Sequence, residues 1–181
     1  MSKLSQAGTW QFELDPTSTK GFILGQSEGK LATLGDTISL PGSTDKAGKG
    51  TVNTKIHLDH LSREYIYVGP AWYQREIVIP ENWQGKHVKL FLERCHWESA
   101  AWLGNDYLGR QNSLSAPHVY DLGYLTPGTY TLTLRIDNTP KIPIGDAIAF
   151  TGSFNLAHAI TDHTQTNWNG TTNNRNANSQ R

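Results

Sequence analysis

The sequence predicts an all-β fold, a sandwich or a barrel, and three observations support this. The composition includes 17 Gly, 8 Pro, 6 Trp and 7 Tyr with abundant Thr, which suits strands joined by tight turns. Two-residue alternation of apolar and polar side chains recurs along the chain, while helical periodicity is nearly absent. Turn sequences with Gly or Pro, such as PENWQGK, LGNDYLG and LTPGT, separate the candidate strands. Short strands at this spacing are typical of a sandwich or barrel.

The individual strands are predicted by the side chains that alternate along them. In TYTLTLRIDN, residues 129–138, one face carries the apolar side chains of Tyr130, Leu132, Leu134 and Ile136. The other face carries Thr and Arg, so we expect one buried face on this strand. HVKLFLE, residues 87–93, repeats the pattern with Val88, Leu90 and Leu92 inward. WYQREIVIP, residues 72–80, places Tyr73, Ile77 and Ile79 on one side, and Pro80 ends the strand.

The domain organisation follows from length and local composition. The 181 residues suit one domain, which we place at residues 1–170. Residues 14–55 are turn-rich and weakly apolar, so we expect long loops around a few short strands. The tail at 171–181 has one Ala and no larger apolar side chain. Such a segment cannot bury enough surface to offset its ordering entropy, and we expect disorder there.

The stretch ERCHWE, residues 93–98, groups residue types that are common in active sites. Read as part of one continuous strand over residues 91–104, it places Glu93 and Glu98 on opposite faces. A pair of catalytic carboxylates must point at one bond, and Cys95 and His96 point apart in the same way. We therefore expect Cys95 and Trp97 to pack in the core, with Arg94, His96 and Glu98 pairing on a polar face.

Charge and motifs exclude several function classes. Sixteen basic residues balance sixteen acidic ones, and no run of Lys and Arg suits nucleic acid or an anionic membrane. No stretch approaches the ~20 apolar residues of a membrane span. The single Cys gives no evidence about the compartment. HLDH, with His57, Asp59 and His60, is too small a group for a metal-site signature, so no metal and no cofactor are expected.

The segment HAITDHTQTNWNG, residues 158–170, is a candidate carbohydrate-binding loop. It combines planar polar side chains, which can read sugar hydroxyls, with an aromatic ring that can stack on a sugar face. An ordinary polar loop with Trp168 packed against the sandwich fits the sequence equally well.

Several ordered pieces of the sequence resemble the N-terminal sugar-binding domain of glycoside hydrolase family 2, the family of β-galactosidases, β-glucuronidases and β-mannosidases. The pieces are GTWQFELD, WYQREIVIP, VKLFLERCHWESAAWLGNDYLG, PHVYDLGYLTPGTYTLTLRIDN and HTQTNWNG, which together span about residues 8–170. The resemblance implies a galactose-binding-like jelly-roll sandwich. It also implies that both catalytic glutamates lie in a separate downstream (β/α)₈ barrel, so neither Glu93 nor Glu98 is catalytic.

The resemblance further implies which segments contact sugar. In family members two segments of this domain tend to reach the active site of the barrel. Here they are LSREYIYVGP, with Arg63, Glu64 and Tyr65, and the stretch with Asp162, His163, Asn167 and Trp168. After Gly170 the sequence reads TTNNRNANSQR, where the family continues with an apolar strand that closes the sandwich. A truncated chain or a shortened relative would explain this, and a missing strand would leave an exposed sheet edge.

The leading hypothesis is a non-catalytic sugar-binding domain of a family 2 glycoside hydrolase. Its partners would be the terminal sugar of a β-glycoside and the catalytic barrel of the same parent chain. One alternative is an autonomous lectin-like module that binds sugar on exposed tryptophans, with Trp83 and Trp168 as candidates, although Trp83 better fits a turn residue folded back on the sandwich. A purely structural domain is the other alternative. The sequence leaves the compartment open, and a periplasmic or secreted location is compatible with the resemblance.

Overall fold

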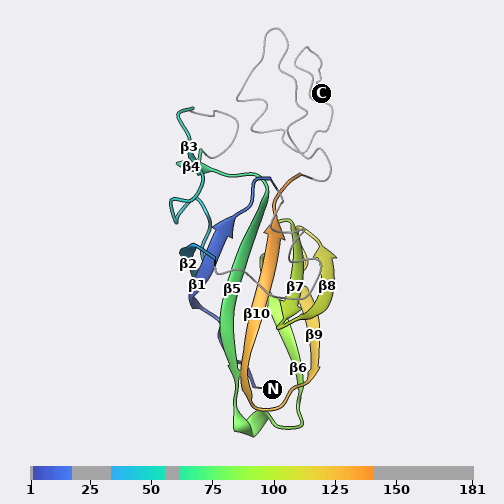
Figure 1. The fold of residues 1–181 in the computed structure, drawn as a ribbon. Coiled ribbons are helices and arrows are strands. Elements are labelled where there is room, and N and C mark those ends of the chain that lie inside the picture. Colours follow the sequence, from blue (N-terminus) through green and yellow to red (C-terminus); the bar gives the residue numbers. More distant parts are fainter. Residues whose placement is uncertain (1, 18–33, 56–61, 141–181) are drawn as a thin grey trace, which may run out of the picture. The chain divides into compact units, whose positions relative to one another are not determined.

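Ten β-strands and one 3₁₀ helix make up the part of the chain that the computed structural model describes, residues 2–17, 34–55 and 62–140 (Figure 1). The chain divides into two units. The first, residues 1–54 and 63–139, contains all of these elements. The second, residues 55–62 and 140–181, lies almost entirely outside the described residues.

The larger sheet has six strands in the order β2-β1-β5-β10-β7-β8, and every neighbouring pair is antiparallel. Its strands are β1 (Gly8–Leu14), β2 (Asp36–Leu40), β5 (Pro70–Ile79), β7 (Glu98–Leu103), β8 (Asp106–Asn112) and β10 (Gly128–Asp137). The two central strands, β5 and β10, pair along ten residues each, from Gly128 opposite Ile79 to Asp137 opposite Pro70. This long pairing forms the centre of the sheet.

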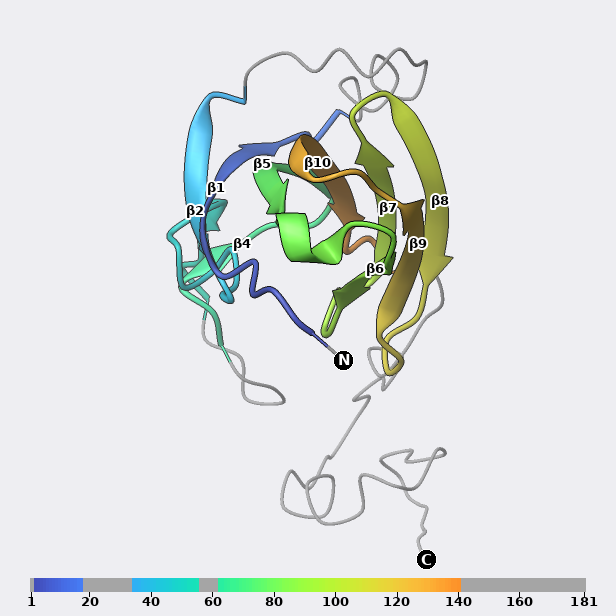
Figure 2. The same ribbon diagram turned by 90° about the horizontal axis from the view of Figure 1, so that it is seen from below.

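Two smaller sheets complete the described part of the fold. Strands β6 (His87–Leu92) and β9 (His118–Tyr124) pair with each other, as do the short strands β3 (Thr51–Val52) and β4 (Tyr65–Ile66). Viewed along the strands, β9 and β6 follow β8 around the curve of the larger sheet (Figure 2). The side-chain amide of Gln111 on β8 donates to the carbonyl of Val119 on β9, and its oxygen accepts the amide of Val119 at 3.3 Å. This one side chain therefore links the two sheets as a strand backbone would.

The main hydrophobic core lies between the six-stranded sheet and the β6–β9 sheet. It takes the inward side chains of both, including Phe12, Leu132, Val88, Leu90 and Tyr120. Burying apolar surface contributes about 25 cal/mol per Å², so this shared core is what holds the two sheets together. The all-β sandwich predicted from sequence is confirmed; the jelly-roll connectivity and the domain limits at residue 170 remain predictions.

The strands predicted at residues 72–80, 87–93 and 129–138 lie where the alternation places them, but the burial of the last differs from the prediction. Leu132 and Leu134 are buried in the core, and Tyr130 and Ile136 pack against it. The opposite face of β10 is covered too: Thr133 is only 1% exposed, and Asp137 is buried. A second cluster of Leu34, Trp72, Ala100 and Trp102 lies on this outer face. The prediction of one buried face on this strand is therefore wrong. The large aromatic side chains of neighbouring strands, Trp72 and Trp102, lie on the same face as its Thr and Arg residues.

The continuous strand expected over residues 91–104 is also wrong. Strand β6 ends at Leu92 and β7 begins at Glu98, and the residues between them form a turn with a cis His96–Trp97 peptide. Trp97 is buried, as expected, but Cys95 is only partly buried and Arg94 and His96 are exposed. Alternation cannot locate such a turn, because its side chains still read as inward and outward.

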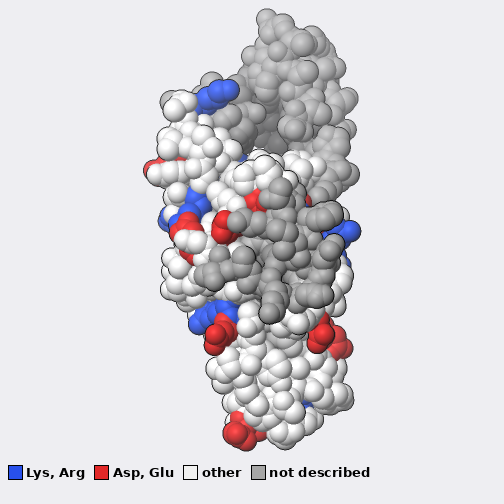
Figure 3. All heavy atoms as spheres, in the orientation of Figure 1, with Lys and Arg blue, Asp and Glu red and all other residues white. Residues whose placement is uncertain are grey.

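The surface of the described residues mixes both signs of charge. On the face in Figure 3, Lys and Arg side chains lie close to Asp and Glu side chains, in keeping with the sixteen of each in the sequence. None of the helical structure in the described residues has the length and hydrophobicity of a membrane span.

Candidate functional site

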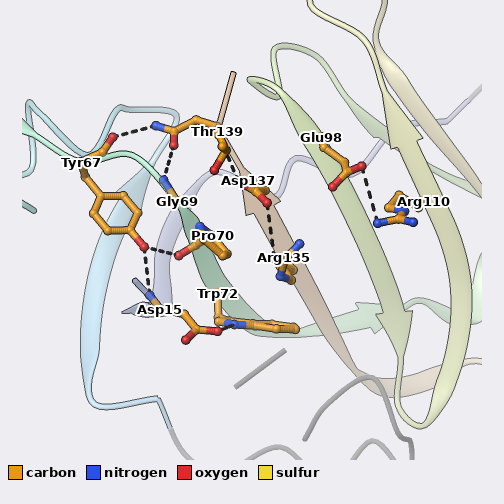
Figure 4. Close-up of polar contacts among 11 residues, drawn as sticks. Asp15, Tyr67, Gly69, Pro70, Trp72, Glu98, Arg110, Arg135, Asp137 and Thr139 are labelled. Carbon is orange, nitrogen blue, oxygen red and sulfur yellow. Dashed lines mark hydrogen bonds and ion pairs between the residues drawn. The ribbon is translucent and has the colours of Figure 1, made fainter. Parts of the chain in front are cut away.

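A network of buried and partly buried polar contacts lies at the end of the sandwich where β5 begins and β10 ends (Figure 4). The indole N–H of Trp72 donates to Oδ2 of Asp15 at 3.0 Å, and Asp15 is 1% exposed. The Asp15 amide donates to the Pro70 carbonyl at 2.9 Å. A buried carboxylate needs donors of this kind to offset its lost hydration. Asp15 thereby fixes the end of β1 against the start of β5.

Tyr67 and Asn138 hold the segment that enters β5. The Tyr67 hydroxyl donates to the Pro70 carbonyl and lies 3.2 Å from the Asp15 amide, and burial raises the pKa of this hydroxyl. The Asn138 carboxamide accepts the Gly69 amide at 2.8 Å and donates to the Tyr67 carbonyl at 2.9 Å. Gly69 has φ +139°, and a Cβ there would lie 3.0 Å from the Tyr67 hydroxyl, so glycine is required.

The same segment carries two of the predicted sugar-contacting residues, Arg63 and Glu64. Their backbone is held by Asn53, whose side chain donates to the Arg63 carbonyl at 2.8 Å and whose amide donates to the Glu64 carbonyl at 2.7 Å. An oxygen of Asp45 accepts the amide of Tyr65 at 2.8 Å. Arg63 and Glu64 are themselves exposed. The backbone of this segment is thus fixed at several points, while its charged side chains point to solvent.

Two carboxylates on neighbouring strands face each other at the same end of the sheet. Glu98 and Asp137 are directly opposite in the register, and both are buried. Like charges in that arrangement repel. Arg135 lies 3.4 Å from Asp137 and Arg110 lies 3.6 Å from Glu98, so each carboxylate has a cation beside it. The Arg135 guanidinium also lies 6.0 Å from the centre of the Trp72 ring, which ties these pairs to the Asp15 network.

A Ser–His–Tyr group in the core was missed by the sequence reasoning. Ser99 Oγ lies 2.6 Å from His118 Nδ1 and 2.6 Å from the Tyr120 hydroxyl, and His118 Nε2 lies 3.2 Å from the Ser113 carbonyl. A serine beside a histidine is the arrangement of a nucleophile and its base. Here Ser99, His118 and Tyr120 are at most 2% exposed, so no substrate reaches them. The group connects β7 to β9, and single-sequence reading gives no pattern that would have joined these distant residues.

The other predicted residues divide into two sets. Asp162, His163, Asn167 and Trp168 lie outside the described residues, as do His57, Asp59 and His60. Among the described residues, no group of three or more His, Cys, Asp and Glu is placed to hold a metal ion. Trp83, at the end of the 3₁₀ helix η1 (Glu81–Trp83), is partly buried and packs against the main core. The turn-residue interpretation of Trp83 is therefore confirmed.

Comparison with known proteins shows a shared fold. The chain is similar to β-glucuronidase from Ruminococcus gnavus at 18% identity and a TM-score of 0.57, over 75% of this chain and 21% of that one. Structures of R. gnavus β-glucuronidase in complex with uronic isofagomine and with D-glucaro 1,5-lactone align at 19% identity, with TM-scores of 0.56 and 0.55. The chain thus spans about a fifth of the length of these enzymes. No family model and no curated protein matches the sequence.

Proposed function

We propose that this chain is the non-catalytic, sugar-binding β-sandwich of a family 2 glycoside hydrolase. The observation that carries the proposal is the fold likeness: three quarters of this chain superimposes on one fifth of a β-glucuronidase. The ordered motifs between residues 8 and 170 support it independently, because they resemble the same domain of that family. Each line of support concerns one domain, and the chemistry is assigned to a separate catalytic barrel.

The division of labour follows from what hydrolysis requires. Retaining glycosidases use two carboxyl groups about 5–5.5 Å apart, one as acid and one as nucleophile. The buried carboxylates of the sandwich, Asp15, Glu98 and Asp137, are instead held by Trp72, Arg110 and Arg135. Carboxylates that are paired in this way stabilise the fold. As the family resemblance implies, the catalytic pair is proposed to lie in a separate barrel, and the sandwich to supply contacts to the terminal sugar.

Two sets of side chains are proposed to make those contacts. The first is Arg63 and Glu64, which are exposed on a segment whose backbone is fixed by Asn53, Asp45 and Asn138. A fixed backbone lowers the ordering cost of binding. The second set is Asp162, His163, Asn167 and Trp168, whose amide, acid and indole groups suit hydroxyl recognition and ring stacking.

The first test is hydrolysis by the chain alone. Aryl β-galactoside, β-glucuronide, β-mannoside and β-glucoside should all remain uncleaved, because the catalytic pair belongs to the barrel. Glu93→Gln and Glu98→Gln variants serve as controls for any trace activity. Hydrolysis that is lost in either variant would contradict the proposal.

The second test is a tryptophan-fluorescence titration of the chain against galactose, glucose, mannose and glucuronate. Saturable quenching by one sugar, lost in Trp168→Ala and weakened in Arg63→Gln and Glu64→Gln, is the expected result. A response that survives all three substitutions would remove these residues from the proposed contact set. A flat response at concentrations well above ~1 mM would mean that the domain contacts sugar only together with its barrel.

A further inference from the structure

The outer face of the β7–β8 hairpin carries an exposed aromatic ring beside an exposed cation. Tyr107 is 57% exposed, and the Arg110 side chain is 61% exposed. In the register Tyr107 is opposite Trp102 and Arg110 is opposite Ala100, which are two residues apart on β7. Two such positions lie on one face of a strand about 7 Å apart. The two side chains therefore leave β8 on the same face, and neither belongs to the residues proposed above to contact sugar.

A β-bulge places the two side chains on the same face. Residues three apart on a regular strand point to opposite faces, but the register of β8 shifts between the partners Ala101 and Trp102. Gly109 lies in this bulge with φ +116°, a conformation that favours glycine. Leu108 meanwhile packs against the main core. Bulges of this kind re-aim side chains and occur often at binding sites.

Both side chains are supported from beneath. The Tyr107 ring centre lies 5.2 Å from that of Trp102, which lies 5.5 Å from Trp72, so one side of the Tyr107 ring rests on a buried aromatic row. Glu98 is nearly buried and lies 3.6 Å from the Arg110 guanidinium. A guanidinium has five N–H donors, and one ion pair with Glu98 leaves most of them to solvent. The surface is thus pre-organised before any ligand binds.

We propose that Tyr107 and Arg110 form a binding site for an acidic saccharide. An aromatic ring with one supported side offers its other side to the C–H face of a pyranose ring. Arg110 supplies only donors, and a guanidinium binds carboxylate or sulfate oxygens through paired hydrogen bonds. Because Arg110 reaches towards Glu98, the ligand carries its anionic group on the Glu98 side of the stacked ring. This site goes beyond the proposed function and does not depend on a barrel.

The test is an NMR titration of the ¹⁵N-labelled full chain with methyl β-glucuronide, glucose 6-sulfate and methyl β-glucoside. We expect saturable shifts of the amides of residues 107–110 with at least one acidic ligand, and much smaller shifts with the neutral glycoside. The carboxylate and sulfate ligands identify which anion is preferred. Absence of shifts at residues 107–110, or equal binding of the neutral glycoside, would overturn the proposal.

Two variants and two matched controls separate the contributions. Tyr107→Ala should weaken binding at least tenfold, and Arg110→Gln should remove the preference for the acidic ligand. Tyr124→Ala removes another exposed tyrosine, and Arg94→Gln another exposed arginine, and both should bind like the parent chain. Loss of binding in these controls would also count against the site. Ligand binding that is lost in Trp168→Ala but kept in Tyr107→Ala would support the proposed function and reject this inference. The proposed function and the present inference can therefore fail separately.

Discussion

Single polar residues join distant strands of this sandwich, and Ser99 is the clearest case. Its hydroxyl lies between His118 and Tyr120, all of them buried. In Ser99→Ala the His118 Nδ1 loses its partner, whereas Tyr120 keeps the Ser99 carbonyl at 2.8 Å. An unsatisfied buried group costs about 1–3 kcal/mol, so urea unfolding should show a loss of that size. Ser39→Ala on the exposed side of β2 should change stability by less than ~0.5 kcal/mol, and equal effects of the two would contradict this account.

Cys95 illustrates a residue whose environment suppresses its chemistry. Burial raises the pKa of the Cys95 thiol to about 11. Only the thiolate reacts with alkylating reagents, so alkylation of the folded chain at pH 8 should be much slower than that of a free thiol. The rate should rise steeply as the pH approaches about 11. The same chain unfolded in urea is the control, and equal rates in folded and unfolded chains would show that the fold does not raise the pKa of the thiol.

At the scale of elements, the segment before β5 depends on the side chain that follows β10. Asn138 binds both the Gly69 amide and the Tyr67 carbonyl. In Asn138→Ala both backbone groups lose their partner, so the free energy of local opening should fall by ~1–3 kcal/mol. Hydrogen exchange in a peptide covering residues 63–70 should become correspondingly faster. Asn138→Asp keeps an acceptor for Gly69 and should have an intermediate effect.

Asn112→Ala, on the exposed end of β8, is the matched control and should leave exchange in residues 63–70 unchanged. A similar acceleration in both variants would mean that general destabilisation, not the loss of these two hydrogen bonds, governs the segment.

The elements that were predictable from sequence are those in which local pattern and tertiary burial agree. β10 is predictable because every second side chain along it is apolar and faces the core, with Leu132 and Leu134 both buried. The turn between β6 and β7 is not predictable from the sequence because Cys95 and Trp97 keep the alternation of a strand through a segment that contains a turn and a bend. The polar network was missed for a different reason: Asn138, Tyr67 and Asp15 come from separate segments, and only the fold brings them together.

At the scale of the whole molecule, one core unites the two main sheets, and this determines how the chain unfolds. Leu132 and Leu134 of the six-stranded sheet and Val88 and Leu90 of the β6–β9 sheet lie in the same buried cluster. Neither sheet can lose the other without exposing this surface. We therefore expect a single cooperative transition in urea for the described sandwich, with tryptophan fluorescence and far-UV circular dichroism giving the same midpoint.

Substitutions on opposite sides of the core test whether the two sheets unfold in one transition. Leu132→Ala on β10 and Leu90→Ala on β6 should each lower the free energy of unfolding by about 2–5 kcal/mol, because each leaves a cavity in the shared core. Both should move the midpoints of the two probes together. Val78→Ala, on the exposed side of β5, should leave the midpoint nearly unchanged because Val78 is 60% exposed. If Leu90→Ala produced a separate early transition in one probe, the β6–β9 sheet would be an independent unit, and the core would not couple the two sheets as this packing requires.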